Sequence, residues 1–235
     1  MDNFVSYNWM EMQPMKISRG LMGSVYMKGY VYIAGGVTTR SDDTFGGVIK
    51  KWERYNIKDD YWEVIASLNE KRKNTSLWVV ENKYIYAFGG WQQELSYVER
   101  IERYEHLENL SETTNKLEPD QWESLNVFLP EFMSSIVSYA INDKIILLFG
   151  GWFKNKFTNA FSQDDNPSLS QAKSKQVYKF IIEHQQFLPE KKELDEPLIS
   201  IYPPFVLEDQ ILLINEDVKQ NCPKVLRYDI SKAIL

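Results

Sequence analysis

The residue types that most often perform catalysis or bind metals are scarce in this chain. Among its 235 residues there are two histidines, His106 and His184, and a single cysteine, Cys222. A protein metal site usually combines histidine, cysteine and carboxylate ligands. The acidic pairs Asp42-Asp43 and Asp164-Asp165 have the oxygen ligands that calcium prefers, but solvated turn residues explain such pairs equally well. We therefore expect no catalytic residues, no metal and no cofactor.

The overall composition argues against several other functions. The chain has 27 basic and 33 acidic residues and a formal net charge of -6, with a pI near 5.2, whereas a nucleic-acid-binding protein usually presents a basic stripe. No apolar run approaches the roughly 20 residues that a membrane helix needs. One cysteine cannot form an intramolecular disulfide, which suits a reducing compartment. We expect a soluble cytoplasmic protein that binds neither nucleic acid nor membrane.

The elements that would position any site form a repeat. The stretch Tyr84–Trp91 is an apolar run that contains a Gly-Gly pair at its end, and three other stretches resemble it. These are Tyr32–Gly36, Leu147–Trp152 and a degenerate copy, Leu212–Asn215. Such a run predicts a strand buried on both faces, which ends where the backbone turns tightly or approaches a neighbour. Four copies indicate a repeat protein, and repeat architectures carry many different functions.

An aromatic residue recurs at a nearly constant distance from the glycine-ended strands, and we use it as a second marker of the repeat. One aromatic residue lies 26 to 28 residues before the end of each of these strands, at Trp9, Trp62, Trp122 and Phe187. Between the marker and the strand end, each unit predicts a β-hairpin. The hairpins are Leu21–Met27 with Tyr30–Ala34, Thr75–Val80 with Tyr84–Phe88, Ser134–Ile141 with Lys144–Phe149, and Ser200–Leu207 with Gln210–Ile214. A third strand with a recurring aromatic residue, usually tyrosine, follows at Trp52–Tyr55, Ile101–Tyr104, Val177–Phe180 and Leu226–Asp229.

This ordered set of markers resembles the kelch repeat. The kelch motif combines apolar residues before a Gly-Gly pair with a tyrosine in the third strand and a tryptophan in the fourth, and all three occur in the first two units. The third unit has Phe187 in place of the tryptophan, and the fourth has lost both glycines. The resemblance covers nearly the whole chain. It implies an all-β fold, a kelch-type β-propeller of four-stranded antiparallel blades.

The resemblance also implies a single domain, residues 1–235, with about three full blades and one shared or incomplete blade. Blades are expected at residues 16–66, 71–127, 130–190 and 197–235, with residues 1–12 as the outer strand of a closing or preceding blade. Kelch domains usually have more blades than this. The chain therefore forms either an unusually small ring or an arc of a larger one, and we favour an arc completed by further chain or by a partner.

Kelch geometry places the second-to-third and fourth-to-first loops on one face, which is the expected binding face. Arg19 and Arg72 lie there, just before the first strands of their blades, where the resemblance implies an arginine. Such a guanidinium could contact a partner carboxylate or bond blade carbonyls beside the central channel. Trp91 and Trp152 follow glycine pairs and could anchor an interface or lean on the adjacent blade. Arg40, in the first of these loops, completes the candidate partner-binding residues.

The function that we expect is that of a non-catalytic protein-protein interaction module with a substrate-receptor, adaptor or scaffold role. Ubiquitin-ligase and cytoskeletal assemblies are the partners that the resemblance implies. Two alternatives remain open: a structural subunit whose open blade edges pair with other chains, and an enzyme that binds a small molecule in the propeller pocket. A copper oxidase of this general kind would need a cysteine near an active-site tyrosine, and Cys222 lies in the degenerate unit.

Overall fold

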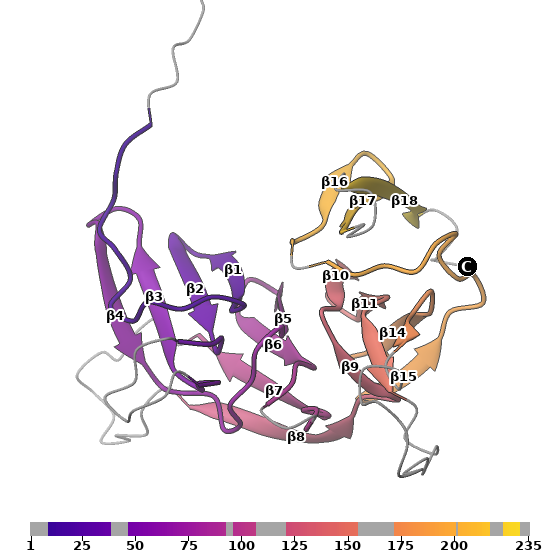
Figure 1. Ribbon diagram of the computed structural model, residues 1–235, viewed down its shortest axis with the longest axis horizontal. Helices are drawn as coiled ribbons and strands as arrows, with labels where there is room; N and C mark the ends of the chain where they lie inside the picture. The colour runs from indigo at the N-terminus through magenta and orange to yellow at the C-terminus, as the bar shows by residue number, and fades with distance from the viewer. Residues whose placement is uncertain are drawn as a thin grey trace, which may run out of the picture.

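In the computed structural model, four antiparallel sheets are arranged as the blades of a β-propeller, and a fifth, small sheet accompanies them (Figure 1). The structure describes residues 9–38, 47–92, 96–106, 121–154, 172–200, 202–216 and 223–230. The named elements within these residues are all β-strands. The expected all-β propeller, with an incomplete last blade, is confirmed.

Each of the first three blades is a four-stranded antiparallel sheet whose strands pair in chain order. The first blade comprises β1 (Gly23–Met27), β2 (Tyr30–Ala34), β3 (Trp52–Asn56) and β4 (Tyr61–Ile65). The second comprises β5 (Ser76–Val80), β6 (Tyr84–Phe88), β7 (Arg100–Glu105) and β8 (Trp122–Phe128). The third comprises β10 (Val137–Asn142), β11 (Ile145–Phe149), β14 (Val177–Ile181) and β15 (Gln186–Pro189). The aromatic markers Trp62, Trp122 and Phe187 therefore lie in fourth strands.

The fourth blade has three strands within the described residues: β16 (Phe205–Leu207), β17 (Gln210–Asn215) and β18 (Lys224–Asp229). Its first strand is shorter than the expected Ser200–Leu207. Pro203 and Pro204 precede it, and a proline has no backbone N–H with which to extend a ladder. A separate small sheet accompanies the third blade and contains β9 (Phe132–Ser134), β12 (Trp152–Lys154) and β13 (Ala172–Lys173).

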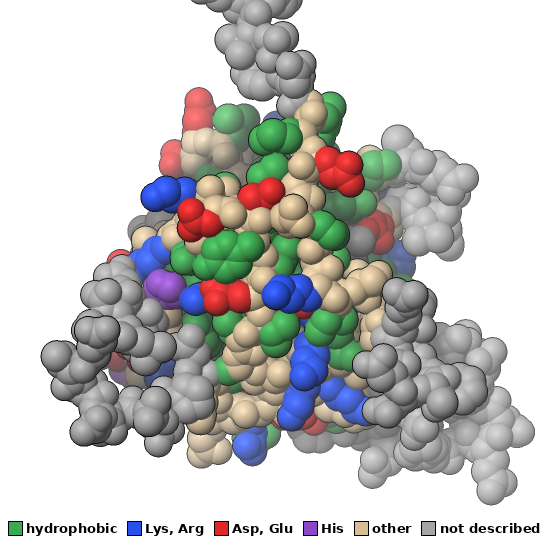
Figure 2. Space-filling model, turned by 90° about the vertical axis from the view of Figure 1, so that its left-hand side faces the viewer, with side chains coloured by type: hydrophobic (Ala, Val, Ile, Leu, Met, Phe, Trp, Pro, Cys, Tyr) green, Lys and Arg blue, Asp and Glu red, His purple; other side chains and the backbone are tan. Residues whose placement is uncertain are grey.

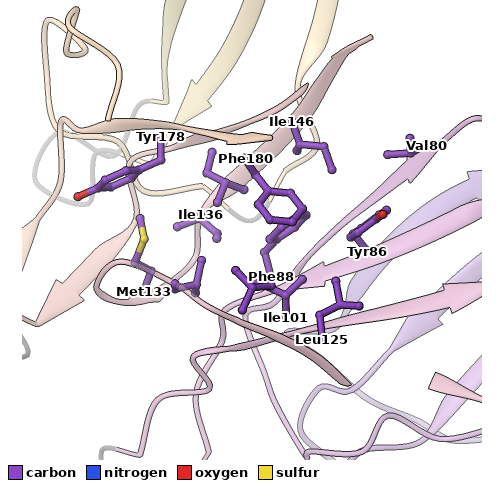
Figure 3. Packing of buried hydrophobic residues seen from close by; sticks show 13 residues of the cluster. Val80, Tyr86, Phe88, Ile101, Leu125, Met133, Ile136, Ile146, Tyr178 and Phe180 are labelled. Atoms are coloured by element: carbon purple, nitrogen blue, oxygen red, sulfur yellow. The ribbon is translucent and has the colours of Figure 1, made fainter. Parts of the chain in front are cut away.

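The second strand of a blade is apolar on both faces because neighbouring blades cover both sides of the sheet. In β6, Ile85 and Ala87 belong to the cluster shared with the first blade. Tyr86 and Phe88 belong to the cluster shared with the third blade, shown in Figure 3. There the rings of Phe88 and Phe180 meet edge to face, with centroids 5.7 Å apart. Full burial of one such side chain stabilises the fold by about 1.5–3 kcal/mol.

The glycine pairs occur where backbone passes close to the end of the second strand. Gly89 and Gly90 have φ values of 60° and 99°, which favour glycine. A Cβ on Gly89 would lie 2.5 Å from the carbonyl oxygen of Met133, in the segment that enters the third blade. A Cβ on Gly90 would lie 2.7 Å from the carbonyl oxygen of Lys73, in the segment that enters the second blade. The first glycine of the pair thus allows the backbone of the next blade to approach closely. The second glycine allows the entering segment of its own blade to do the same.

Two kinds of backbone hydrogen bond recur between each pair of neighbouring blades. In the first set, the second glycine of a pair donates to the next blade: Gly36 to Arg72 at 2.8 Å, Gly90 to Met133 at 3.0 Å and Gly151 to Leu198 at 2.7 Å. The second set runs between segments that line the central cavity: Asn74 to Leu21 at 2.8 Å, Ser135 to Asn74 at 3.0 Å and Ser200 to Ser135 at 3.5 Å. The three blade interfaces are therefore copies of one arrangement.

The two ends of the arc stand apart in Figure 1, where the first blade and the fourth blade lie on opposite sides of a gap. Residues 1–8 lie outside the described residues, and residues 9–12 form no strand, in contrast to the outer strand expected over 1–12. Trp9 is fully exposed there. A strand needs a partner for its backbone groups, and the described part of the chain places none beside this segment.

Candidate protein-binding face

The loop face, as we call it, carries the second-to-third loops together with the segments that enter each blade. On this face, the residue after each glycine pair forms an antiparallel bridge with the entering segment of the same blade. The bridged residues are Val37 with Gly20, Trp91 with Lys73, and Trp152 with Ser134. The predicted contact residues Trp91 and Trp152 therefore occupy equivalent positions in the second and third blades.

Arg72 is fully buried beneath the loop face. Its Nη1 donates to the carbonyl oxygen of Gly89 at 3.2 Å, and its Nη2 donates to that of Arg100 at 3.4 Å. Nη2 also forms an ion pair with the buried carboxylate of Glu102. The guanidinium thus ties the segment that enters the second blade to the second and third strands of that blade.

Glu102 has donors from the same entering segment as well as from Arg72. The backbone N–H groups of Asn69 and Glu70 donate to its two oxygens at 2.6 Å and 3.2 Å. A buried charge is tolerated when it is both paired and hydrogen-bonded. The carboxylate therefore fixes the course of the segment that leads from the first blade into the second.

Arg19 makes the corresponding contacts in the first blade. Its Nη1 donates to the carbonyl oxygens of Gly35 at 3.0 Å and Lys51 at 2.6 Å, and its Nη2 lies 3.4 Å from Glu53. Burial lowers the pKa of Arg19 and raises the pKa of Glu53, and the attraction between the two charges only partly opposes both effects. Both arginines thus bond blade carbonyls beside the channel, one of the two roles that the sequence left open.

Trp91 and Trp152 are partly exposed on the loop face. The ammonium group of Lys73 lies 4.2 Å from the ring centroid of Trp91, and that of Lys173 lies 5.7 Å from the ring centroid of Trp152. Each indole thus carries a cation over its face, an arrangement that favours a defined ring orientation. Arg40 lies outside the described residues, so the structure places four of the five predicted contact residues.

A basic groove that the sequence analysis did not single out lies on this face between the first and second blades. The groove has a volume of about 520 Å³ and includes Lys50, Lys51 and Lys71 in its lining. All three lysines are exposed, and none has an ion-pair partner within the described residues, although Glu70 also lines the groove. The sequence could have indicated these lysines. Lys50 and Lys51 directly precede the third strand of the first blade, and Lys71 directly precedes the buried Arg72.

A larger cavity of about 710 Å³ lies at the centre of the arc, lined chiefly by the first strands of the blades. Its wall includes Ser76 and Ser138, whose hydroxyl groups are 2.7 Å apart. Among the described residues, no three His, Cys, Asp or Glu side chains are placed to share a metal ion. His106 is buried, with Nδ1 2.9 Å from the hydroxyl of Tyr32. Within the same residues, no helix is long and apolar enough to span a membrane.

Several chemical candidates from the sequence cannot be placed. The acidic pairs Asp42-Asp43 and Asp164-Asp165 and the cysteine Cys222 all lie outside the described residues. His184 is described; it lies exposed in the turn between β14 and β15, away from His106.

Comparison with known proteins agrees with the repeat pattern and the blades. No protein-family model matches the chain. Kelch-like protein 40 of Xenopus tropicalis is 38% identical over 85 residues, which is 36% of this chain and 13% of that protein. Kelch repeat and BTB domain-containing protein 1 of camelpox virus (strain CMS) is 32% identical over 114 residues, 48% of this chain and 18% of that protein.

A human relative, kelch repeat and BTB domain-containing protein 6, is 31% identical over 80 residues, 34% of this chain and 11% of that protein. These partial matches agree with the glycine-ended second strands and aromatic fourth strands that recur through the arc of blades. The chain has the fold of a kelch-type β-propeller. The matches span less than a fifth of each relative's own length, so they show similarity to kelch proteins over that part alone.

Proposed function

We propose that this kelch propeller is a non-catalytic protein-binding module that acts as an adaptor, scaffold or substrate receptor. The observation that carries the proposal is the basic groove on the loop face. Lys50, Lys51 and Lys71 surround it without ion-pair partners in the described part of the chain. Some other lysines of this protein form ion pairs, as Lys83 does with Glu105 at 2.8 Å.

The chemistry of the groove favours a partner segment that carries carboxylates. The chain as a whole is acidic, with a net charge of -6. The three groove lysines have no ion-pair partner among the described residues, and they outnumber Glu70, the acidic residue in the same lining, so the groove carries a local charge of opposite sign. Such a patch steers an acidic partner and determines its register. Ile49 in the groove lining supplies an apolar surface beside the charges, as is usual at the centre of a binding site.

The arginines and tryptophans have different parts in this proposal. Arg19 and Arg72 are positioning residues, because their guanidinium groups are committed to carbonyls and carboxylates inside the blades. Trp91 and Trp152 present partly exposed rings on the same face and are proposed as aromatic contacts. Arg40 remains a proposed contact in the loop of the first blade.

The assembly in which such a module works is also a proposal. Two of the relatives have BTB in their names, and a kelch propeller in that context would present its loop face to a protein that the assembly acts on. We propose a cytoplasmic protein partner in a ubiquitin-ligase or cytoskeletal assembly. The identity of a purified partner decides between the two.

The test compares two variants with the same charge change on opposite faces. Lys51→Glu/Lys71→Glu reverses two lysines of the groove. Lys58→Glu/Lys144→Glu reverses two exposed lysines in the turns between β3 and β4 and between β10 and β11, on the face away from the groove. Partners are identified by affinity purification with mass spectrometry on the full chain, and the dissociation constant of the purified partner is then measured at two salt concentrations.

We expect the groove variant to bind the partner at least about tenfold more weakly, the equivalent of ~1.4 kcal/mol, while the control variant binds like the wild type. Binding by the wild type should also weaken as salt rises. Equal binding by both variants would exclude the groove as the contact site. Arg72 is unsuited to this test, because leaving Glu102 buried without its cation costs about 3–5 kcal/mol of stability.

A further inference from the structure

The first strands of the blades line the cavity at the centre of the arc (Figure 1). Its volume of about 710 Å³ falls within the range of about 300–1,000 Å³ that is usual for small-molecule sites. β1, β5 and β10 contribute the largest part of the wall, and the segment before β16 contributes Tyr202, Pro203 and Pro204. Among the described residues, none lines both this cavity and the basic groove, so the two are separate sites.

The wall of the cavity is almost uncharged. Arg19 is the one charged residue among the described residues that line it. Its guanidinium is already committed to two blade carbonyls and to Glu53. The outer surface differs, because charged side chains lie among the hydrophobic ones there, as Figure 2 shows for one side of the molecule. A charged ligand would lose its hydration in the cavity without gaining a partner of opposite charge, so the wall suits an uncharged ligand.

Most of the side chains in the wall are apolar or aromatic. Tyr26 of the first blade is 61% exposed, and Tyr202 of the fourth blade is 47% exposed. Trp78 of the second blade is half-buried, and its ring packs against that of Tyr139, with centroids 5.1 Å apart. Large apolar surfaces that are open to water in a concave site favour the binding of apolar groups. The ligand that fits this wall therefore has an apolar body.

A pair of hydroxyl groups interrupts the apolar wall between the second and third blades. The hydroxyl oxygens of Ser76, on β5, and Ser138, on β10, lie 2.7 Å apart. The backbone N–H of Ser138 also donates to the hydroxyl oxygen of Ser76, at 3.1 Å. Ser138 is 1% exposed, whereas Ser76 is half-buried. A buried O–H needs an acceptor, and for Ser138 that acceptor is the hydroxyl oxygen of Ser76.

The hydroxyl group of Ser76 is thereby left with a donor and no further acceptor capacity. Its oxygen accepts from both the O–H and the N–H of Ser138, which uses the two lone pairs of a serine hydroxyl. Its own O–H has no acceptor within the described part of the chain. A ligand in the cavity satisfies this O–H only if it supplies an acceptor, such as a carbonyl oxygen.

The repeat does not require this hydroxyl pair. Ser76 and Gly23 occupy the same position in their blades, since each pairs with the residue directly before a glycine pair. Between the first and second blades, however, the corresponding contact is apolar: a Cβ on Gly23 would lie 2.8 Å from Cγ of Leu77. The polar contact between the second and third blades is therefore a local feature of the cavity.

We propose that the central cavity binds an uncharged small molecule that combines an apolar body with a carbonyl oxygen. The hydroxyl of Ser76 donates to that oxygen, and the apolar body packs against the wall that includes Tyr26 and Trp78. Neutral ketones, amides and esters have this combination, whereas carboxylates, phosphates and amines do not. The site is independent of the basic groove and involves no catalysis.

Benzophenone is a suitable probe, because it is an uncharged ketone with two apolar rings and light attaches it covalently to nearby C–H groups. The matched control is para-benzoylbenzoate, which has the same ketone and rings and one added carboxylate. Each probe is titrated against the full chain, and mass spectrometry of the digested protein gives the labelled peptides and the concentration for half-maximal labelling. We expect benzophenone to label β1, β5 or β10 saturably, and the control to label them at least about tenfold more weakly.

Ser76→Ala removes the donor and should raise the half-maximal benzophenone concentration about three- to tenfold, which is the usual range for one neutral hydrogen bond. Ser76→Thr keeps a hydroxyl and should label like the wild type. Lys51→Glu/Lys71→Glu alters the basic groove alone and should leave cavity labelling unchanged, so this proposal and the groove function are tested separately. Circular dichroism checks that each variant is folded.

Three results would overturn the proposal. Labelling of the first strands that does not saturate, or that is no stronger than labelling of the exposed Phe205 and Val225, would show that the cavity is not a site. Equal labelling by the two probes would show that the wall does not select against charge, a comparison that needs only the wild type. An unchanged half-maximal concentration in folded Ser76→Ala would exclude this hydroxyl as the donor.

Discussion

Arg19 and Arg72 show how one residue type at one repeat position can differ in its electrostatics. Glu102 accepts two backbone N–H groups at 2.6 Å and 3.2 Å in addition to its ion pair with Arg72. Glu53 has Arg19 at 3.4 Å, and burial raises its pKa despite that neighbour. The same Arg–Glu pair is thus better compensated where the chain enters the second blade than where it enters the first, although both pairs are buried.

The raised pKa of Glu53 predicts a pH dependence of stability. The folded protein holds a proton on Glu53 more tightly than the unfolded chain does. In the unfolded chain, the pKa of this side chain has its ordinary value of 4.5. The contribution of this group to the free energy of unfolding is therefore fully present below pH 4.5 and declines as the pH rises through the raised pKa.

The Glu53→Gln variant has no ionisable group at this position. Its free energy of unfolding should therefore increase relative to that of the wild type as the pH rises from 4.5 to 7. Urea unfolding at several pH values measures the difference, with Glu81→Gln in an exposed turn as the control for loss of one acidic residue. A difference that stays constant over this range would contradict the assignment.

At the scale of the element, the end of the second strand decides how closely neighbouring blades approach. The onward hydrogen bond of Gly90 to Met133 at 3.0 Å is made where Gly89 leaves no room for a side chain. The third strand shows a different element-scale effect: Ile101 packs toward the third blade, and Tyr104 packs toward the first blade. Their spacing of three, which alone would also suit a helix, places them on opposite faces of a strand.

Gly89→Ala should destabilise the protein by about 2–4 kcal/mol. About 1–2 kcal/mol comes from the left-handed conformation, and the remainder comes from the contact with the Met133 carbonyl, since overpacking costs about 1–3 kcal/mol. Gly29 is a matched control, because it has a φ of 82° but open space around its Cβ position. Gly29→Ala should cost only the conformational part. Equal losses in denaturant unfolding would show that the interface contact contributes nothing.

At the scale of the whole molecule, stability should decline toward the fourth blade. The second and third blades are covered on both sides, whereas the fourth blade is covered on one side and has three strands among the described residues. Opening free energies in a protein follow local burial and backbone pairing.

Amides of β17 should therefore exchange with deuterium at least about tenfold faster than those of β6 in dilute protein, which corresponds to ~1.4 kcal/mol in opening free energy. Hydrogen exchange read by mass spectrometry provides this measurement. Protection of β17 that rises with protein concentration would support coverage of the fourth blade by a second copy. Equal exchange in both strands at every concentration would show that the fourth blade is as stable as the second.

The repeat, the hairpins, the third and fourth strands and the kelch resemblance could all be predicted from the amino-acid sequence. These features depend on local rules: paired glycines, alternation of apolar residues and turn chemistry recur in phase, and each unit folds in the same way. The shortened β16 departs from the expected strand because Pro203 and Pro204 interrupt it.

The contacts of each candidate side chain, in contrast, depend on how the blades pack together. Arg19 and Arg72 are identical in sequence terms to exposed arginines, and their burial against Glu53 and Glu102 follows from the packing of consecutive blades. The lysine groove brings together segments about twenty residues apart, which composition does not reveal. Whether an apolar face is covered depends on what lies opposite it, and so the exposure of Phe205, Leu207 and Val225 on the fourth blade became visible only in the assembled arc.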